Sequence, residues 1–393
     1  MTRDAAGMLD LDANATTPLL PEVLEAMLPW LREGYANPSG SYKAAKLARA
    51  AIEQARAQVA ELIGAQPDEI IFTGSGTESV NTALRSLDGL AGPGPAVVSA
   101  IEHSAVLRCV ENQARETRLV GVTAGGRLDL AAYATALDGA AWVSIMAANN
   151  ETGVIQPLRE AVDLARARGL PVHSDAIQAA GKIQLNVREL ALDLLSLSAH
   201  KFHGPKGVGA LYLRRGLGFE PLLRGGGQEA GRRAGTENTA GIVGMGAAAL
   251  CALRYFAKPA HCPVSSLRDA FEAKVLTETS GVTVNGELTH RLPNTSHLSF
   301  DQCDAAGLLI LLDEAGVACA AGSACLTGSH RPSHVQLAMG IPEARAKTSL
   351  RFSFSRLNTQ AEALAAATAV IQAVAKLRRV QGPDVGPVVL YPA

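Results

Sequence analysis

Residues 192–214, LDLLSLSAHKFHGPKGVGALYLR, decide the fold class. Two short apolar runs, LDLLSLSA (192–199) and VGALYLR (208–214), flank a polar turn that holds Lys201 and two glycines. Runs that are apolar on both faces are typical of strands in a parallel sheet covered by helices. The stretch therefore predicts two buried strands with a lysine in the turn that joins them.

The chain upstream repeats this pattern. Further strand-like runs are AVVSA (96–100), WVSIMAA (142–148) and LPVHSDA (170–176). Alanine-rich amphipathic stretches lie among the apolar runs or precede them, such as residues 42–64, which end at a glycine as helices often do. Alternating strands and helices predict an α/β domain with a mainly parallel sheet, and we place it at residues 15–256.

The character of the sequence changes after residue 256. AKPAHCP (257–263) carries two prolines and is interpreted as a linker. Helix-like and strand-like pieces alternate again beyond it, and TSLRFSFSR (348–356) alternates apolar and polar positions as a half-buried strand would. We expect a smaller α/β domain formed by residues 257–393 together with residues 1–14. The Gly- and Pro-rich end, from residue 380, is interpreted as a loosely packed tail.

Composition excludes several classes of partner. The 393 residues include 48% hydrophobic and 19% charged residues, and 36 Lys and Arg balance 37 Asp and Glu. A net charge of -1 gives no reason to expect a nucleic acid or a membrane as partner. No run of 18 apolar residues and no secretory h-region occur, and the six cysteines form no CxxC pair. These features predict a cytoplasmic protein without a disulfide framework.

Lys201 lies just beyond an apolar strand, between two histidines. A lysine at a buried strand end is costly unless it is neutralised or used covalently, for example in a Schiff base with an aldehyde cofactor. A lysine that extends into solvent from an exposed loop is an equal alternative. The HxxH spacing also suggests a metal, but no further ligands stand at a fixed nearby spacing, and we predict no metal site.

Two other segments carry polar groups at strand ends. HSDAIQAAGK (173–182) places Asp175 at the end of an apolar strand and Gln178 one turn later. The carboxylate there could pair with a pyridinium nitrogen, or it could cap a following helix. TGSGTES (73–79) follows a strand-like run, and its amides around Gly76, with the hydroxyls of Ser75 and Thr77, would seat a phosphate. The lysine of a Walker loop is absent from it.

These pieces are more specific together than apart. A lysine, an acid at a strand end and a glycine turn that seats phosphate are the parts that a pyridoxal phosphate enzyme requires. IEHSAVL (101–107) adds His103 at another strand end, where an imidazole could stack on a pyridine ring. The residues alone therefore favour pyridoxal 5'-phosphate as the cofactor.

GSACLTGSH (322–330) poses a separate question, because its thiol, Cys325, lies among small and polar residues only. A structural cysteine usually has bulky apolar neighbours. Taken alone, the stretch fits either an ordinary turn or an unhindered reactive thiol.

The sequence resembles the cysteine desulfurases, most closely their NifS-type members. The motifs appear in the family's order from about residue 10 to residue 357 and are LDANATTP, NPSG, FTGSGTES, EHSAVL, ANNETG, HSDAIQAAGK, LSLSAHKFHGPKGVG, RGGGQEAGRRAGTENT, LPNT, GSACLTGS, PSHVQLAMG and RFSFSR. The resemblance implies a fold-type I pyridoxal phosphate-dependent transferase, with a mainly parallel seven-stranded sheet. It also implies a homodimer with active sites at the subunit interface.

The same motifs imply roles for single residues around the cofactor ring. Lys201 would hold the cofactor covalently, Asp175 would meet the pyridine nitrogen and Gln178 the phenolic oxygen. His103 would stack on the ring and move protons. The residues implied for the cofactor phosphate are Gly76, Thr77, Ser198, His200 and, from the neighbouring subunit, Thr236.

The remaining implied roles concern the substrate, L-cysteine. Asn150 and Arg351 would bind its carboxylate, and a planar guanidinium suits such bidentate recognition, although Arg351 alone could equally be a solvated charge. Cys325, in a loop at about residues 319–332, would take the sulfur as a persulfide and release L-alanine. A thiolate is needed for this attack, because a thiol is a poor nucleophile. An iron–sulfur scaffold or another acceptor protein, in a pathway related to nitrogenase, would receive the sulfur.

Several positions are left with plain interpretations. The family pattern is broken at Ala13, Tyr42, Ala199, Ala320, Ala321 and Leu326, and none of these carries a group assigned above. Cys319 is interpreted as a small buried residue rather than a second sulfur relay or a regulatory disulfide partner. Arg232 and Arg233 are interpreted as loop charges at an interface.

Three hypotheses for the function follow from this sequence. The first is a cysteine desulfurase, and the second is another pyridoxal phosphate enzyme of similar fold, such as a selenocysteine lyase or an aminotransferase. The third is a sulfur carrier or scaffold that keeps Cys325 but binds no cofactor. The loop with Cys325 distinguishes a cysteine desulfurase from an aminotransferase, which needs no thiol there. Visible absorption by a bound cofactor distinguishes both enzymes from a carrier or scaffold without a cofactor.

Overall fold

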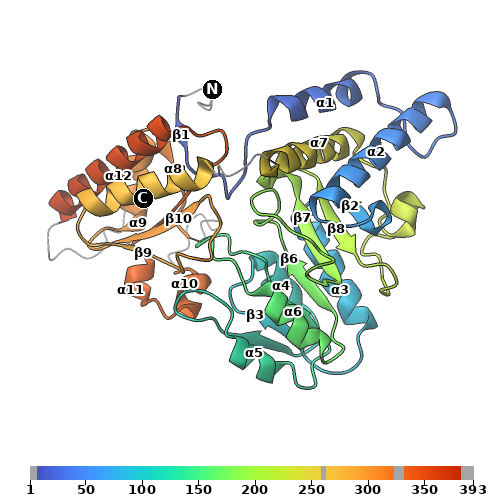
Figure 1. Ribbon diagram of the computed structural model, residues 1–393, viewed down its shortest axis with the longest axis horizontal. Helices are drawn as coiled ribbons and strands as arrows, with labels where there is room; N and C mark the ends of the chain where they lie inside the picture. Colours follow the sequence, from blue (N-terminus) through green and yellow to red (C-terminus); the bar gives the residue numbers. More distant parts are fainter. Residues whose placement is uncertain (1–6, 258–262, 323–331, 382–393) are drawn as a thin grey trace, which may run out of the picture.

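The computed structural model describes residues 7–257, 263–322 and 332–381. A seven-stranded sheet of order β2-β8-β7-β6-β5-β3-β4 occupies its larger part (Figure 1). Only β8 runs against the others, because it pairs antiparallel with both β2 and β7 while the remaining pairs are parallel. The strands are β2 (Ile70–Thr73), β3 (Ala96–Ser99), β4 (Thr117–Val120), β5 (Trp142–Ser144), β6 (Val172–Asp175), β7 (Leu194–Ser198) and β8 (Gly209–Leu213). The predicted fold class is confirmed.

Helices cover both faces of this sheet, since alternate strand residues point to opposite sides. Ile70 and Phe72 pack in the cluster that includes α2 and α7, whereas Ile71 packs with α3 and α4 on the other face. The helices are α1 (Pro21–Arg32), α2 (Lys43–Leu62), α3 (Gly76–Leu90), α4 (Ser104–Glu111), α5 (Leu130–Ala136), α6 (Leu158–Arg166) and α7 (Thr239–Phe256). Three short 3-10 turns are η1 (Pro67–Glu69), η2 (Ala199–Lys201) and η3 (Gln228–Gly231).

The C-terminal part forms a second hydrophobic core around an antiparallel sheet of order β12-β10-β9. Phe271 contacts Phe352 and Phe354 there, with ring centroids 4.8 and 5.5 Å away. The N-terminal strand β1 joins this part, because it pairs with β11 in parallel. The elements are β1 (Leu9–Asp10), α8 (Pro263–Glu278), β9 (Val282–Val284), β10 (Thr295–Phe300), α9 (Ala305–Glu314), β11 (Val317–Ala318), α10 (His334–Ala338), α11 (Glu343–Ala346), β12 (Ser349–Ser353) and α12 (Gln360–Gln381).

The domain boundaries proposed at residues 14/15 and 256/257 stay a prediction. The linker predicted at 257–263 falls largely on residues 258–262, which lie outside the described residues. The same holds for most of the Gly- and Pro-rich tail and for Cys325.

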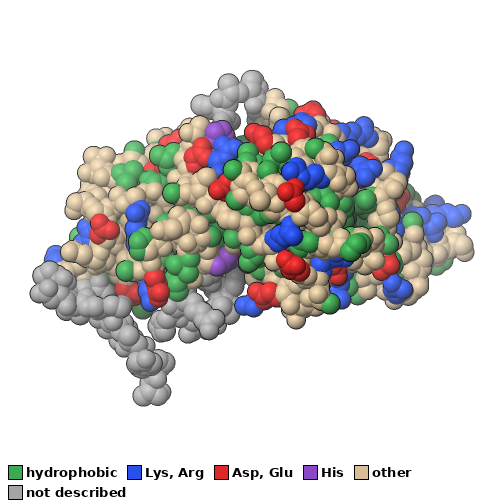
Figure 2. Space-filling view, turned by 90° about the horizontal axis from the view of Figure 1, so that it is seen from below, with side chains coloured by type: hydrophobic (Ala, Val, Ile, Leu, Met, Phe, Trp, Pro, Cys, Tyr) green, Lys and Arg blue, Asp and Glu red, His purple; other side chains and the backbone are tan. Residues whose placement is uncertain are grey.

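Helix α7 is, within the described ranges, long and apolar enough by length and composition to cross a membrane. Of its 18 residues, 56% are buried, and residues such as Met245, Ala248 and Ala249 belong to the large hydrophobic core. This burial is what a core helix requires. On the face seen in Figure 2, acidic and basic side chains are interspersed, in line with the balanced composition.

The direction of the strands places the candidate residues at one edge. Parallel strands present their carboxyl ends on the same side of a sheet, and ligands of open α/β sheets bind there. Thr73, Asp175 and Ser198 end β2, β6 and β7 at this edge, and His103 follows β3 in the same direction.

Candidate active site

Lys201 follows strand β7 in the turn η2, at the carboxyl edge of the sheet. Its Nζ donates to the carbonyl oxygens of Asn14, at 2.7 Å, and Ala15, at 2.8 Å. The ammonium group therefore lies against the N-terminal segment, and the alternative of a lysine that extends into solvent is wrong.

The two flanking histidines also face the N-terminal segment. His200 Nδ1 lies 3.1 Å from the hydroxyl of Thr16, and His203 Nδ1 lies 2.9 Å from the carbonyl oxygen of Pro18. Within the part of the chain that the structure describes, no group of three His, Cys, Asp or Glu side chains could hold a metal ion.

Asp175 is 4% exposed at the end of β6, and its Oδ1 accepts a hydrogen bond of 2.9 Å from the amide of Ile177. Turns follow it rather than a helix, so the helix-cap alternative is wrong. Burial raises the pKa of Asp175 to about 6, although this backbone bond and the charge of Lys201 oppose the rise. At this pKa the carboxyl is still mainly ionised at neutral pH, and a positively charged partner would lower the pKa again.

His103 forms the N-cap of α4, and its Nδ1 accepts a hydrogen bond of 3.1 Å from the amide of Ala105. Burial lowers the pKa of His103, and the charges of Lys201 and His334 lower it further. The neutral ring is therefore favoured, and because Nδ1 accepts, Nε2 carries the hydrogen.

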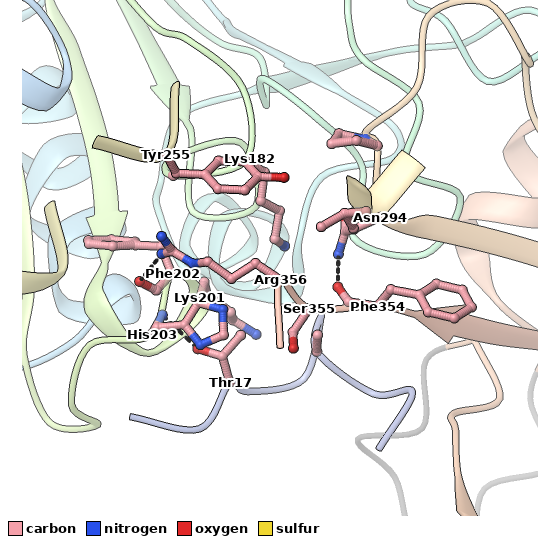
Figure 3. A pocket seen from close by; sticks show the side chains of 14 residues that line it. Thr17, Lys182, Lys201, Phe202, His203, Tyr255, Asn294, Phe354, Ser355 and Arg356 are labelled. Atoms are coloured by element: carbon pink, nitrogen blue, oxygen red, sulfur yellow. Dashed lines mark hydrogen bonds between the residues drawn. The ribbon is translucent and has the colours of Figure 1, made fainter. Parts of the chain in front are cut away.

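The start of α3 makes a cradle for an anion. A Cβ atom at Gly76 would lie 2.4 Å from Cδ1 of Ile177 and 3.1 Å from Cβ of Ser198, so only glycine allows the helix to approach β7 this closely. The Ser75 hydroxyl accepts from the amide of Glu78, which leaves the amides of Gly76 and Thr77 at the helix terminus. Figure 3 shows a pocket whose lining includes Lys201 and His203, which follow β7 in the chain.

Arg351, on β12, is 6% exposed, so its interpretation as a solvated charge is wrong. Its Nη1 donates to the carbonyl oxygen of Asn150 at 2.9 Å, and its Nη2 donates to Asp12 at 2.7 Å. Its Nε is buried with no partner among the described residues. The contact with Asn150 uses the backbone of that residue. The guanidinium thus joins the smaller part of the molecule to the sheet edge.

Thr236 is exposed in this chain. The segment around Thr236 is attached to α2 and α3 by two ion pairs. Glu229 accepts from Arg56 of α2 at 2.7 Å, and Arg233 donates to Glu78 of α3 at 2.9 Å. Arg233 is therefore not simply a loop charge.

Cys319, at the end of β11, lies close to Asp12 and Arg351. Burial, with a contribution from Asp12, raises the pKa of its thiol to about 12. The thiol is accordingly protonated at neutral pH and a poor nucleophile. This favours the interpretation of Cys319 as a structural residue.

Sequence reasoning missed the residue that connects these groups, Asn14. It is 1% exposed, its carbonyl oxygen accepts from Lys201 and Gln178, and its amide nitrogen donates to the carbonyl oxygen of Asn150 at 3.2 Å. Lys182 was missed as well. Both residues stand inside motifs quoted above, DANATT and QAAGK, and the motifs are the only signal that could have found them.

The sheet, the lysine and acid at its carboxyl edge and the glycine cradle define a fold-type I pyridoxal phosphate-dependent enzyme. The residues fit the cofactor on chemical grounds: a buried carboxylate for a pyridinium, an amine for an aldehyde and a helix terminus for a phosphate. The profile of the family described as aminotransferase class-V matches residues 10–365. The chain belongs to this family.

Curated relatives and solved structures agree with this assignment. A cysteine desulfurase of Enterobacter agglomerans is 46% identical over 374 residues, which cover 94% of this chain and 93% of the relative. Cysteine desulfurase NifS of Azotobacter vinelandii is 44% identical over 376 residues, which cover 94% and 93%. A solved NifS-like protein is 33% identical with a TM-score of 0.87, covering 94% of this chain and 100% of that one. SspA, solved in complex with cysteine, is 34% identical with a TM-score of 0.78. The match covers 88% of this chain and 98% of SspA.

Proposed function

We propose that this chain is a cysteine desulfurase that converts L-cysteine to L-alanine and leaves the sulfur on Cys325 as a persulfide. The observation that carries the proposal is the convergence of Lys201, Asp175, His103 and Arg351 at one sheet edge, in a chain that is 44–46% identical to desulfurases over most of its length. In this reaction the Cβ–S bond of the substrate breaks and an S–S bond forms between the substrate sulfur and Cys325. A proton joins the carbon that becomes the methyl group of alanine.

Pyridoxal phosphate, when bound, supplies an electron sink for the electrons released at the substrate's α-carbon. Asp175 strengthens that sink, because its buried carboxylate favours a protonated ring nitrogen beside it. Lys201 holds the cofactor aldehyde and supplies an amine that accepts and returns protons. His103 would stack on the cofactor ring, and its neutral imidazole, with the hydrogen on Nε2, would help to move protons.

Arg351 and Asn150 are assigned to the substrate carboxylate. Arg351 is held from two sides, by Asp12 and by the carbonyl oxygen of Asn150, so its guanidinium is oriented before any ligand arrives. Its buried Nε has no partner among the described residues, and a carboxylate would supply one. Orientation in advance lowers the entropic cost of binding.

Replacing Arg351 by Gln is expected to raise the KM for cysteine about 10- to 100-fold, with a smaller fall in kcat, since a charge-assisted bidentate contact is lost. Steady-state kinetics of alanine formation measure this. Arg215→Gln is the control, because Arg215 pairs with Asp68 at the exposed opposite edge of the sheet. An Arg351 variant with unchanged KM would contradict the assignment.

The test of the whole proposal is incubation of the cofactor-loaded protein with L-cysteine, followed by mass spectrometry of its peptides and assay of alanine. One added sulfur on Cys325 and one alanine per subunit in the first turnover are expected. A preparation that stays colourless with added cofactor would instead support the non-catalytic carrier. Much faster turnover of selenocysteine, without persulfide on Cys325, would favour a selenocysteine lyase.

We also propose a homodimer in which Thr236 reaches the cofactor phosphate of the neighbouring subunit. Thr236 is exposed on a segment attached to α2 by the Arg56–Glu229 pair. Large apolar side chains are also exposed on α1, α2 and their connection: Leu24, Leu31, Tyr35, Tyr42 and Leu47. Exposed apolar side chains of this size are enriched at interaction surfaces, which supports an interface on these helices.

Light scattering is expected to give the mass of two chains. Leu31→Asp with Leu47→Asp should raise the dissociation constant at least about tenfold, because a charge is placed in an apolar interface. The control, Leu288→Asp, alters a comparably exposed leucine in the C-terminal part. A monomeric wild type would refute the dimer and leave the desulfurase proposal standing.

The destination and the compartment complete the proposal. An iron–sulfur scaffold, in a pathway related to nitrogenase, is proposed as the sulfur acceptor, on the likeness to NifS. A cytoplasmic location is supported by the free thiols, since the described cysteines, Cys109, Cys251, Cys303 and Cys319, are all unpaired.

A further inference from the structure

A second lysine, Lys182, lines the same pocket as Lys201, and Figure 3 shows its side chain extending into that pocket. It lies in the turns that follow β6. Its Nζ donates to Oε1 of Gln178 at 2.6 Å and to Oδ1 of Asn14 at 2.9 Å. Both acceptor residues are linked to Lys201, because the backbone carbonyl oxygen of Asn14 accepts hydrogen bonds from Lys201 and from Gln178.

The contacts close a ring around one carbonyl group. The carbonyl oxygen of Asn14 accepts from Nζ of Lys201 at 2.7 Å and from Nε2 of Gln178 at 2.9 Å. Lys182 then joins the side chains of Gln178 and Asn14 to each other. The side chain of Asn14 is anchored further by Asn294, whose amide donates to its Oδ1 at 3.0 Å.

This ring determines which way the amide of Gln178 points. The carbonyl oxygen of Asn14 can only accept and therefore takes the NH₂ group of Gln178, while the Lys182 amine, which has N–H donors in either protonation state, takes the amide oxygen at 2.6 Å. The NH₂ group must therefore point the other way, toward Asn14 and Lys201. One of its two hydrogens is taken by the Asn14 carbonyl, and the second remains available as a donor.

A lysine in this place is costly in free energy. Burial lowers the pKa of Lys182 well below its usual value, and the charges of Lys201 and Arg351 lower it further. Such a cost is acceptable where the amine has a function, or where an apolar residue would leave buried amide oxygens without donors. The two possibilities can be distinguished by the effect of a Lys182 substitution on the behaviour of Gln178.

We propose that Lys182 is a positioning residue that holds the Gln178 amide as a hydrogen-bond donor toward the phenolic oxygen of the cofactor. The inference rests on the proposed function and on the contact between Gln178 and the phenolic oxygen that the family motifs imply. Lys182 does not touch the reacting atoms in this scheme and acts only through its contacts with Gln178 and Asn14.

The experiment is a pH titration of the visible absorption band of the cofactor-loaded enzyme. A hydrogen-bond donor to the phenolic oxygen favours the ionised form of that oxygen, and it therefore lowers the pH at the midpoint of the titration. In Lys182→Met we expect the midpoint to rise by about 0.5–1 pH unit. Lys182→Arg, which keeps the donors and the charge, should stay nearer to wild type and serves as a second variant if the Met variant folds poorly.

A double-mutant cycle separates orientation from charge. In Gln178→Ala there is no amide to orient, so adding Lys182→Met should then leave the midpoint unchanged. An equal rise in both backgrounds, or no rise in either, would overturn the proposal. Lys206→Met removes an exposed lysine whose charge lowers the pKa of His200, and it controls for loss of charge alone. The desulfurase proposal fails separately, if the wild type shows no visible band or forms no alanine.

Discussion

Lys201→Ala is expected to lower the rate of alanine formation from cysteine by at least about 10³-fold, because both the covalent attachment of the cofactor and the amine that moves protons are lost. The described site offers one other amine, Lys182, but its Nζ is engaged by the side chains of Gln178 and Asn14. No group at the sheet edge therefore replaces Lys201. Steady-state assay of alanine measures the loss.

Borohydride reduction identifies the lysine directly. After reduction of the wild type, the cofactor mass should appear on the peptide that contains Lys201 and not on the one with Lys182. Lys206→Ala, which alters an exposed lysine in the same turn region, should keep wild-type activity within about twofold. Cofactor attached to Lys182, or an active Lys201 variant, would contradict the assignment.

Cys325→Ala is expected to abolish transfer of sulfur to the protein while the visible band of the bound cofactor persists. The residues proposed for the cofactor lie at the sheet edge, whereas Cys325 belongs to another segment of the chain, so cofactor binding and sulfur transfer should be separable. Mass spectrometry after incubation with cysteine measures the persulfide, and sulfide release to a dithiol measures delivery. Delivery at the normal rate by this variant would refute the role of Cys325.

Cys319→Ser is the matched control for that experiment. Cys319 lies six positions before Cys325 and near Arg351, yet its thiol has a pKa of about 12 and is protonated at neutral pH. The variant should therefore keep activity within about twofold. A loss comparable to that of Cys325→Ala would revive the relay that the sequence left as an alternative.

The composition of single segments was enough to predict the sheet and one edge of the site. The segments LLSLS and VHSD form fully buried strands because both faces of the sheet are covered, and parallel strands bring their ends to one side. Polar residues at those ends, Asp175, His103 and Lys201, meet there whatever lies between them in the sequence. Strand direction is a property of local pattern and connection, so this part of the site was predictable.

Tertiary structure alone decided how these groups are held. Asn14 contacts Lys201, 187 residues away, and Arg351 reaches Asp12 across 339 residues. Such contacts depend on how the N-terminal segment passes between the two hydrophobic cores, and no spacing or periodicity encodes that path. The sequence pattern assigned no role to Lys182, and its contacts with the side chains of Gln178 and Asn14 became visible only in the folded structure. The sequence by itself determined which chemistry is present, and the packing of distant segments determined the orientation of each group, because hydrogen-bond geometry depends on three-dimensional position rather than on order along the chain.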